Sequence, residues 1–234
     1  MYEIRTRDTD VLILCGGHGT RFRAVSQDIP KALAPIQGQP FIDLLLDDLV
    51  SQCFQRIILA IGHLGEQIEA HVEQRRDVEY LISREEQPLG TGGAIRHALS
   101  LMQSENVLVM NGDSHIAFSI KELLEFHKTK RAEVTVLLSS ATQGTDYGNV
   151  ELENNERVVT FHEKPTKSFS SLINAGVYLI ESTLIQQQLA GPASIEKEWL
   201  PRWAEETRVF GIVTSNPVYD IGTLERFQIA QQHL

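Results

Sequence analysis

Short apolar runs alternate with segments of helical periodicity through the first half of the chain. The runs are rich in Val, Ile and Leu, as expected for strands covered on both faces, and they occupy residues 11–15, 56–61, 78–82 and 106–110. Between them, apolar positions recur at helical spacing. The clearest such set follows Pro40 and consists of Phe41, Ile42, Leu45, Leu46, Leu49, Val50 and Cys53. This order of strands and helices predicts a mostly parallel sheet with right-handed crossovers.

The second half has shorter apolar runs that are separated by turn residues. Strands are predicted at residues 134–139, 147–152, 158–163, 172–180 and 209–213, and helices at 123–130, at 196–203 and after residue 223. The three runs at 147–152, 158–163 and 172–180 predict a mixed or antiparallel extension of the sheet that forms a lid over the site. The complete pattern predicts an α/β fold, a three-layer sandwich with a mostly parallel, partly mixed central sheet, in a single domain over residues 1–234.

Composition and charge narrow the functional classes. A chain of 234 residues can bury one sizeable core, and no apolar run approaches the roughly 20 residues that span a bilayer. The polar N-terminus lacks the core of a signal peptide, so we expect a cytoplasmic protein without a membrane segment. A net charge of −10 argues against binding to nucleic acid. Cys15 and Cys53 stand in apolar surroundings, which predicts buried free thiols.

The first predicted strand ends in a glycine-rich loop, Gly16-Gly17-His18-Gly19. Glycine lets the backbone approach a ligand closely, and three cations follow within a few residues: Arg21, Arg23 and Lys31. Backbone N–H groups that have no partner in the chain, together with nearby positive side chains, favour the binding of phosphate oxygens. The spacing fits neither the dinucleotide fingerprint nor the P-loop. A tight turn with incidental basic residues is the alternative interpretation.

A second set of polar residues follows the strand at 106–110. Asn111, Gly112 and Asp113 follow the carboxyl end of this strand, as the glycine loop follows the first one. Since ligands of parallel sheets bind beyond these strand ends, we expect both segments to converge on one site. A carboxylate beside a phosphate site is a natural Mg²⁺ ligand. Asp220, before the last helix, is a candidate for a second carboxylate ligand. The alternative for Asp220 is a helix N-cap.

The segment GGHGTR with a downstream PKALAP resembles the signature of sugar-phosphate nucleotidyltransferases, G-G-x-G-T-R…P-K-x-x-x-P. The family usually carries a proline shortly after the arginine, whereas this chain has Ala24, so the local turn differs. Further motifs that resemble the family are GD at Gly112-Asp113, EKP at 163–165, NAG at 174–176 and DIGT at 220–223. They follow the family order over nearly the whole chain, and the resemblance implies a Rossmann-like GT-A fold.

The resemblance implies a role for each matching residue. Asp113 and Asp220 correspond to the metal-binding aspartates, and Arg21 and Lys31 to the catalytic cations on the pyrophosphate and the reacting phosphates. The implied sugar-phosphate-binding residues are Gly148, Glu163, Lys164 and Asn174. The implied nucleotide-binding residues are Cys15, Gly16, Gly17, Gly19, Thr20, Arg21, Gln87, Gly90, Thr91, Gly92, Asn111 and Gly112.

The spelling of these motifs is most similar to short guanylyltransferases that act on D-glycero-D-manno-heptose 1-phosphate. The resemblance thus implies Mg²⁺, GTP and this sugar 1-phosphate, with a GDP-sugar and pyrophosphate as products. Related enzymes that use UTP or dTTP with a hexose or N-acetylmuramate 1-phosphate share most of the motifs. A non-catalytic sugar-nucleotide-binding subunit and a metal-dependent glycosyltransferase are further alternatives. The sequence leaves the oligomeric state open.

Overall fold

The computed structural model describes residues 6–17, 28–141, 147–163 and 171–234. The main sheet consists of β1 (Asp10–Leu14), β4 (Arg56–Ile61), β5 (Glu79–Arg84), β6 (Asn106–Asn111), β8 (Val134–Ser139), β9 (Asn149–Leu152), β10 (Val158–His162), β11 (Ile173–Glu181) and β12 (Val209–Thr214). Two short pairs are β2 (Pro35–Ile36) with β3 (Gln39–Pro40), and β7 (Ser114–His115) with β13 (Tyr219–Asp220).

The helices are α1 (Phe41–Ser51), α2 (Gly65–Val72), α3 (Gly90–His97), α4 (Ile120–Lys130), α5 (Ser182–Gln186), α6 (Leu200–Glu206) and α7 (Leu224–His233). Single turns of 3-10 helix occupy η1 (Thr6–Asp8), η2 (Lys31–Leu33) and η3 (Ala98–Leu101), and η4 (Ile195–Trp199) is a turn of π-helix. No helix within the described ranges is long and apolar enough to span a membrane.

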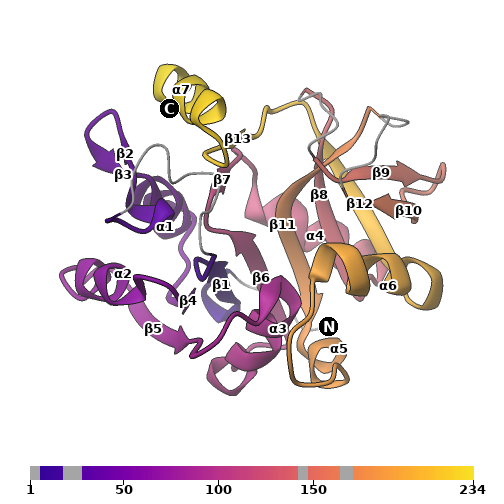
Figure 1. The fold of residues 1–234 in the computed structure, drawn as a ribbon. Helices are drawn as coiled ribbons and strands as arrows, with labels where there is room; N and C mark the ends of the chain where they lie inside the picture. Colours follow the sequence, from indigo (N-terminus) through magenta and orange to yellow (C-terminus); the bar gives the residue numbers. More distant parts are fainter. Residues whose placement is uncertain (1–5, 18–27, 142–146, 164–170) are drawn as a thin grey trace.

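The sheet is mixed, because β10 and β11 run antiparallel to their neighbours. Its order is β10-β9-β11-β6-β1-β4-β5, and β8 also pairs with β11 and carries β12 on its other side. Strands β1, β4, β5 and β6 are parallel, whereas β11 runs antiparallel to both β6 and β8 (Figure 1). The mostly parallel, partly mixed sheet is therefore confirmed. The predicted extension of the sheet is confirmed, because β9, β10 and β11 are strands of the main sheet with antiparallel pairing. The predicted lid is wrong for β11, which lies inside the sheet between β6 and β8 and is buried along eight of its nine residues.

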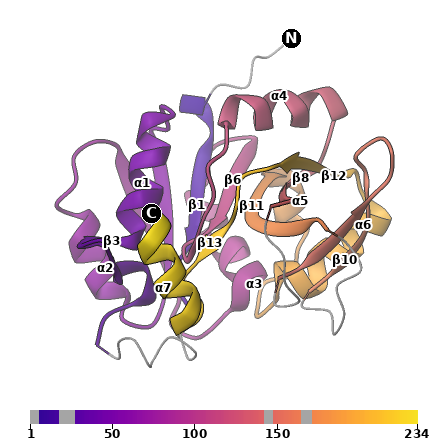
Figure 2. The same cartoon turned by 90° about the horizontal axis from the view of Figure 1, so that it is seen from above.

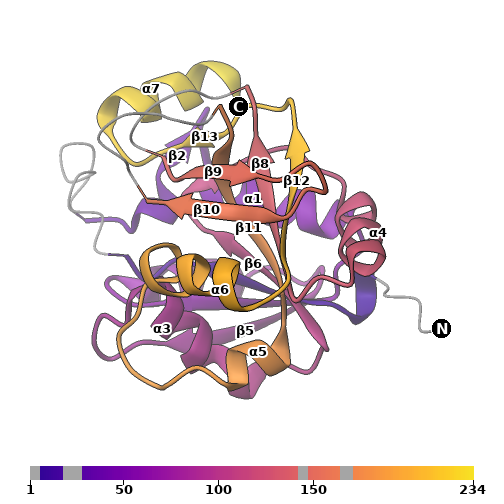
Figure 3. The same ribbon diagram turned by 90° about the vertical axis from the view of Figure 1, so that its right-hand side faces the viewer.

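Helices cover both faces of this sheet, which confirms the three-layer sandwich. On β1, Val11 and Ile13 pack into the core shared with α1, α2, α4 and α7, while Leu12 packs into the core shared with α3, α5 and α6. Alternate residues of a strand point to opposite faces, so an all-apolar strand supplies both cores. Figure 3 shows α7 and α1 on one side of the sheet and α3, α5 and α6 on the other.

Helix α1 bears out the predicted apolar face but ends before its last member. Phe41 and Leu45 are among its buried residues, and Pro40 stands immediately before the first turn, where a missing N–H costs nothing. The helix ends at Ser51, and Cys53 has a positive φ of 68° with an exposed side chain. The prediction that both thiols are buried is therefore wrong for Cys53, because the chain reverses there.

The C-terminal segment crosses back to the middle of the sheet. Strand β13 pairs antiparallel with β7, so that Asp220 lies opposite Ser114, next to Asp113 in the chain. Helix α7 follows beside β13, on the same side as α1 (Figure 2). Its N-cap is Thr223, whose hydroxyl accepts from the Arg226 N–H. The helix N-cap alternative for Asp220 is therefore wrong, and its carboxylate is available for other contacts.

A buried histidine ties α4 to the sheet. His127 Nδ1 lies 2.8 Å from Thr135 Oγ1 on β8, and Nε2 lies 3.1 Å from Asn106 Oδ1 on β6. Burial lowers the pKa of His127 from 6.5 to about 4, because the charged ring would lose its hydration. The neutral ring suits both neighbours, since Nε2 donates to the amide oxygen and Nδ1 accepts from the hydroxyl.

We expect acid to destabilise the fold through His127. The unfolded chain binds a proton here near pH 6.5 and the folded chain only near pH 4, so the free energy of unfolding falls as the pH drops through this window. The loss from His127 is on the order of 3 kcal/mol, and His127→Gln should remove it. Denaturant titrations at several pH values measure the effect, with exposed His162→Gln as the control. An unchanged pH dependence in His127→Gln would refute this prediction.

The two thiols should differ in reactivity. Burial, reinforced by the charge of Asp113, raises the pKa of Cys15 to about 12, whereas Cys53 is exposed. Since the thiolate is the reactive form, alkylation of the native protein at about pH 8 should modify Cys53 alone. Mass spectrometry after alkylation, with and without denaturant, checks this, and Cys53→Ser should abolish the native reaction. Rapid native alkylation of Cys15 is the contrary outcome.

Candidate active site

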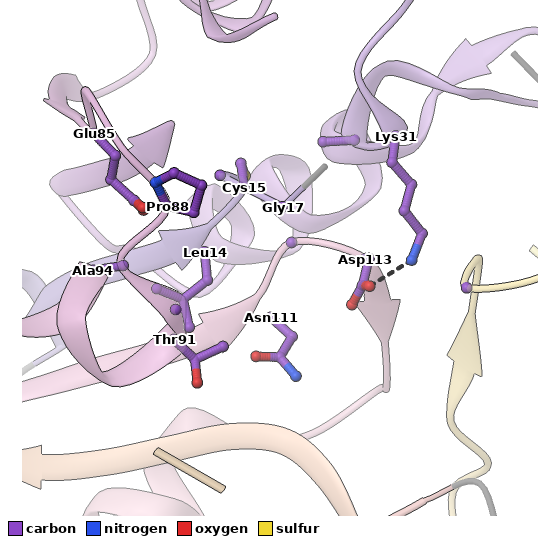
Figure 4. Close-up of a pocket in the computed structure, with 15 residues that line it drawn as sticks. Leu14, Cys15, Gly17, Lys31, Glu85, Pro88, Thr91, Ala94, Asn111 and Asp113 are labelled. Carbon is purple, nitrogen blue, oxygen red and sulfur yellow. Dashed lines mark hydrogen bonds and ion pairs between the residues drawn. The ribbon is translucent and has the colours of Figure 1, made fainter. Parts of the chain in front are cut away.

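The larger of two adjoining cavities lies at the carboxyl ends of β1, β5 and β6. It encloses about 360 Å³ and is lined by Leu14, Cys15, Gly16, Gly17, Lys31, Ala32, Glu85, Pro88, Gly90, Thr91, Ala94, Asn111, Gly112, Asp113 and Gly222 (Figure 4). Parallel strands end at one edge, which brings the glycine loop and the Asn111-Gly112-Asp113 turn to one wall. The predicted convergence of these two segments is confirmed.

Close backbone packing holds this wall together. A Cβ on Gly112 would lie 2.6 Å from Cys15 Sγ, and one on Gly16 would lie 2.7 Å from Glu85 Oε1. Both distances are shorter than real Cβ atoms tolerate, so these glycines let the loops after β1, β5 and β6 approach one another. A Cβ on Gly17 would meet nothing within 4 Å. Gly17 is therefore the described glycine of this loop that leaves room for a ligand.

Lys31 and Asp113 form an ion pair on the cavity wall. Lys31 Nζ donates to Asp113 Oδ2 at 2.5 Å (Figure 4). Lys31 begins η2, whereas Asp113 follows β6, so the pair joins segments that are 82 residues apart in the chain. The Lys31 side chain is 15% exposed and that of Asp113 is 44% exposed. A lysine already held beside a carboxylate at a cavity is well placed for an anionic ligand and its metal.

A smaller cavity of about 120 Å³ adjoins the larger one. Its lining residues are Asn111, Asp113, Ser114, Tyr147, Gly148, Glu163, Asn174, Ala175, Gly176, Glu196, Val218, Asp220, Gly222 and Arg226. Asn111, Asp113 and Gly222 line both cavities. Two ligands bound side by side would therefore meet at the end of β6.

Asn111 stands at this junction with an unused acceptor. Its Oδ1 is buried and has no hydrogen-bond partner among the described residues. Gly176 makes room for the amide, because it adopts φ +73° and a Cβ there would lie 2.7 Å from Asn111 Nδ2. A buried acceptor without a partner is costly, so a ligand or metal-bound water that donates to it would be favoured.

Asp220 is held by three neighbours. The Tyr147 hydroxyl donates to Oδ2 at 2.5 Å, and the Gly222 N–H donates to Oδ1 at 2.8 Å. Arg226 Nη1 lies 3.2 Å from Oδ1 and 3.1 Å from Oδ2. The carboxylate is thus fixed at the cavity wall while its charge is balanced by an arginine.

Asp113 and Asp220 suit a hard divalent cation. The backbone links them, because the Ile221 N–H donates to the Asp113 carbonyl at 3.0 Å, and both side chains line the smaller cavity. The described residues contain no cluster of three or more His, Cys, Asp or Glu that could hold a metal. Two carboxylates with remaining positions for water and phosphate are what Mg²⁺ prefers, whereas a closed zinc site needs more protein ligands.

Most of the predicted site residues lie at these two cavities. The larger cavity is lined by Cys15, Gly16, Gly17, Lys31, Gly90, Thr91, Asn111, Gly112 and Asp113. The smaller cavity is lined by Gly148, Glu163, Asn174, Asp113 and Asp220. Gly19, Thr20, Arg21 and Lys164 lie outside the described residues, and their roles stay predictions.

Gln87 and Gly92 do not line either cavity. Gly92 packs within the protein, because its N–H donates to the Ala193 carbonyl at 2.9 Å and a Cβ would lie 3.0 Å from the Trp199 ring. Gly90 has a positive φ of 68° and also faces the Ala193 carbonyl. These glycines therefore let the segment before η4 dock on the start of α3.

Several cavity residues were missed from the sequence. Glu85 follows β5 directly and accepts from the Leu89 N–H at 2.9 Å, so the rule of carboxyl strand ends alone could have found it. Glu196 accepts from the hydroxyls of Thr91 at 2.6 Å and Ser194 at 3.0 Å. It lies on a turn of π-helix, and no local pattern predicts such a turn or its contact with Thr91.

Curated proteins of similar sequence include guanylyltransferases. D-glycero-alpha-D-manno-heptose 1-phosphate guanylyltransferase of Aneurinibacillus thermoaerophilus is 31% identical over 227 residues, which cover 96% of this chain and 98% of that protein. The mannose-1-phosphate guanylyltransferase catalytic subunit beta of Drosophila pseudoobscura pseudoobscura is 32% identical over 94% of this chain. This chain spans only 60% of the length of that relative.

Solved structures agree in fold. The crystal structure of HddC from Yersinia pseudotuberculosis matches with a TM-score of 0.84 and 29% identity, over 96% of this chain and 98% of that one. The same protein complexed with GMP-PN matches with a TM-score of 0.82 and 30% identity. The family described as Nucleotidyl transferase matches residues 10–234. The chain therefore belongs to the nucleotidyl transferase family.

Proposed function

We propose that this protein transfers GMP from GTP to D-glycero-α-D-manno-heptose 1-phosphate, with GDP-heptose and pyrophosphate as the products. The observation that carries the proposal is the pair of adjoining cavities with Asp113 at their junction. The larger cavity offers glycine backbone and Lys31, which suit a nucleotide. The smaller one offers carboxylates and an amide, which suit the hydroxyl groups of a sugar.

The spelling of the motifs supports heptose as the sugar. The relative that acts on the heptose 1-phosphate is 31% identical to this chain over 227 residues, and the mannose-1-phosphate relative, 32% identical, makes mannose the competing sugar. The complex of HddC with GMP-PN supports a guanine nucleotide. A glucose-1-phosphate thymidylyltransferase from Bacillus anthracis, described as putative, is only 22% identical and supports the fold alone.

The reaction brings two anions together, and the residues of the site offset their repulsion. Two unit charges about 6 Å apart repel by roughly 3 kcal/mol at an effective dielectric of about 20, and several such pairs are involved. Lys31 would contact phosphate oxygens from the wall of the larger cavity. We assign Arg21 to the leaving pyrophosphate and Lys164 to the sugar phosphate on the resemblance of their motifs.

Nucleotidyl transferases generally use a divalent metal, and we propose Mg²⁺ for this chain. Asp113 and Asp220 would hold it, because their carboxylates face one cavity and offer the oxygen ligands that Mg²⁺ prefers. When bound, the ion neutralises phosphate charge. Both residues are held in place by neighbours in the folded chain, so the site is preorganised.

No protein nucleophile is required. An oxygen of the sugar phosphate attacks the α-phosphorus of GTP and forms the new P–O bond, while the bond to pyrophosphate breaks and pyrophosphate leaves with its electron pair. Cys15 lies at the cavity, but its pKa of about 12 keeps the thiol protonated near neutral pH. Catalysis would consist of positioning and charge stabilisation.

Asp113→Asn should abolish most of the activity without unfolding the protein. The amide keeps the size of the side chain and can still contact its neighbours, but it loses the charge that a metal requires. We expect turnover, measured as pyrophosphate release, to fall by at least about 100-fold, as for loss of a group that stabilises charge in the transition state. Circular dichroism checks the fold. Near-normal activity would rule out the metal role of Asp113.

Substrate identity can be tested with a matrix of four NTPs and a panel of sugar 1-phosphates. We expect GTP with D-glycero-α-D-manno-heptose 1-phosphate to give the highest kcat/KM, with mannose 1-phosphate as the competitor. Higher kcat/KM with UTP or dTTP would overturn the guanine assignment. Tight nucleotide binding without turnover of any pair would instead indicate a non-catalytic sugar-nucleotide-binding subunit.

A further inference from the structure

The smaller cavity has an unusual charge balance for a site that receives a phosphate. Four carboxylates line it: Asp113, Glu163, Glu196 and Asp220. Arg226 is the only lysine or arginine among its lining residues in the described part of the chain. A sugar 1-phosphate that enters carries additional negative charge. Cationic groups must therefore face the phosphate, and among the described residues Arg226 is the one in position.

The guanidinium of Arg226 is held in a fixed orientation. It lies in the first turn of α7, over the ring of Tyr147, with 4.3 Å between Cζ and the ring centroid. Nη1 contacts both oxygens of Asp220, and the Arg226 side chain is 20% exposed. Stacking on an aromatic ring and pairing with a carboxylate both limit its rotation. Two contacts thus hold Arg226 at the cavity wall, and of these the ion pair with Asp220 is the one that a ligand of Asp220 would weaken.

The two predicted metal ligands are each paired with a protein cation. Lys31 pairs with Asp113 and lines the larger cavity, whereas Arg226 pairs with Asp220 and lines the smaller one. A metal on these carboxylates would take over their charge. Each cation would then interact less strongly with its aspartate and more strongly with a phosphate on its own side. The planar guanidinium fork also matches phosphate oxygens in geometry.

We propose that Arg226 binds the phosphate group of the sugar 1-phosphate, and that it turns from Asp220 to this phosphate when Asp220 binds the metal. The inference rests on the proposed function and adds a phosphate-binding residue to its sugar site. In the same way, Lys31 would exchange Asp113 for a phosphate group of the nucleotide in the larger cavity. Metal binding and binding of the two anionic substrates therefore favour one another.

Arg226→Gln tests the proposal by steady-state kinetics. The KM for the sugar 1-phosphate should rise about 10- to 100-fold, as expected for the loss of a hydrogen bond between charged groups, and the KM for GTP should change by less than about 3-fold. Arg226→Lys keeps the positive charge but loses the planar guanidinium fork. Its KM for the sugar 1-phosphate should therefore lie between those of the wild type and Arg226→Gln. Arg208→Gln is the matched control, because Arg208 also pairs with a carboxylate, Glu133, and lines neither cavity.

Binding experiments supply readouts that do not depend on turnover. Titration of Mn²⁺ into protein without substrates, followed by electron paramagnetic resonance, should show equal or tighter metal binding in Arg226→Gln, because a cation that competes for Asp220 is gone. A calorimetric titration measures the affinity for the sugar 1-phosphate directly. The protein is mixed with Mg²⁺ and a GTP analogue that carries a methylene bridge between its α- and β-phosphates, and the sugar 1-phosphate is then titrated in. The affinity should be lower in Arg226→Gln than in the wild type.

Three outcomes would overturn the inference. Unchanged affinity for the sugar 1-phosphate in Arg226→Gln would show that Arg226 only balances Asp220. An equal rise of both KM values with weaker Mn²⁺ binding would show that it only positions Asp220. If the wild type neither turns over nor binds any sugar 1-phosphate, the proposed function fails; inorganic phosphate is then the probe, and equal phosphate affinity in wild type and variant refutes the inference.

Discussion

Charge compensation around Asp113 and Asp220 is the constraint on which the rest of the site depends. Two carboxylates at one cavity are stable because Lys31 and Arg226 balance them, and the Tyr147 hydroxyl further fixes Asp220. Under the proposed function, a metal held by the two carboxylates would weaken these ion pairs, and Lys31 and Arg226 would then be available to phosphate groups. The charges that stabilise the free protein would in that case also contribute to substrate affinity.

The sheet brings these charges together by two different devices. Parallel pairing of β1 and β6 places the glycine loop and Asp113 at one edge, as in any sheet of this kind. Asp220 arrives from the other end of the chain through the short pairing of β13 with β7. The antiparallel strand β11 inserts beside β6 and carries Asn174 and Gly176 to the second cavity. The two cavities thus share the end of β6.

Several glycines at the site serve packing between neighbouring segments. Gly112 and Gly16 permit contact between neighbouring loops. Gly92, on α3, leaves room for the Trp199 ring of η4. A sequence motif with glycines at fixed spacing does not separate these roles, because each requires only the absence of a Cβ. Local patterns therefore locate the glycines but do not tell which of them pack against neighbouring segments.

Apolar periodicity is a local property of the chain, so it was enough to predict the order of strands and helices and the mostly parallel sheet, and the motifs marked most of the residues that line the two cavities. Sequence reasoning failed for Cys53 and for the place of residues 172–180, and it missed Glu85, Glu196 and Arg226. These features depend on contacts between segments that are distant in the chain. They are the exposure of Cys53 at a chain reversal, the insertion of β11 into the sheet and the pairing of Arg226 with Asp220. Only the tertiary structure decides such contacts, because each is selected by the packing of the whole core and not by its neighbours in the chain.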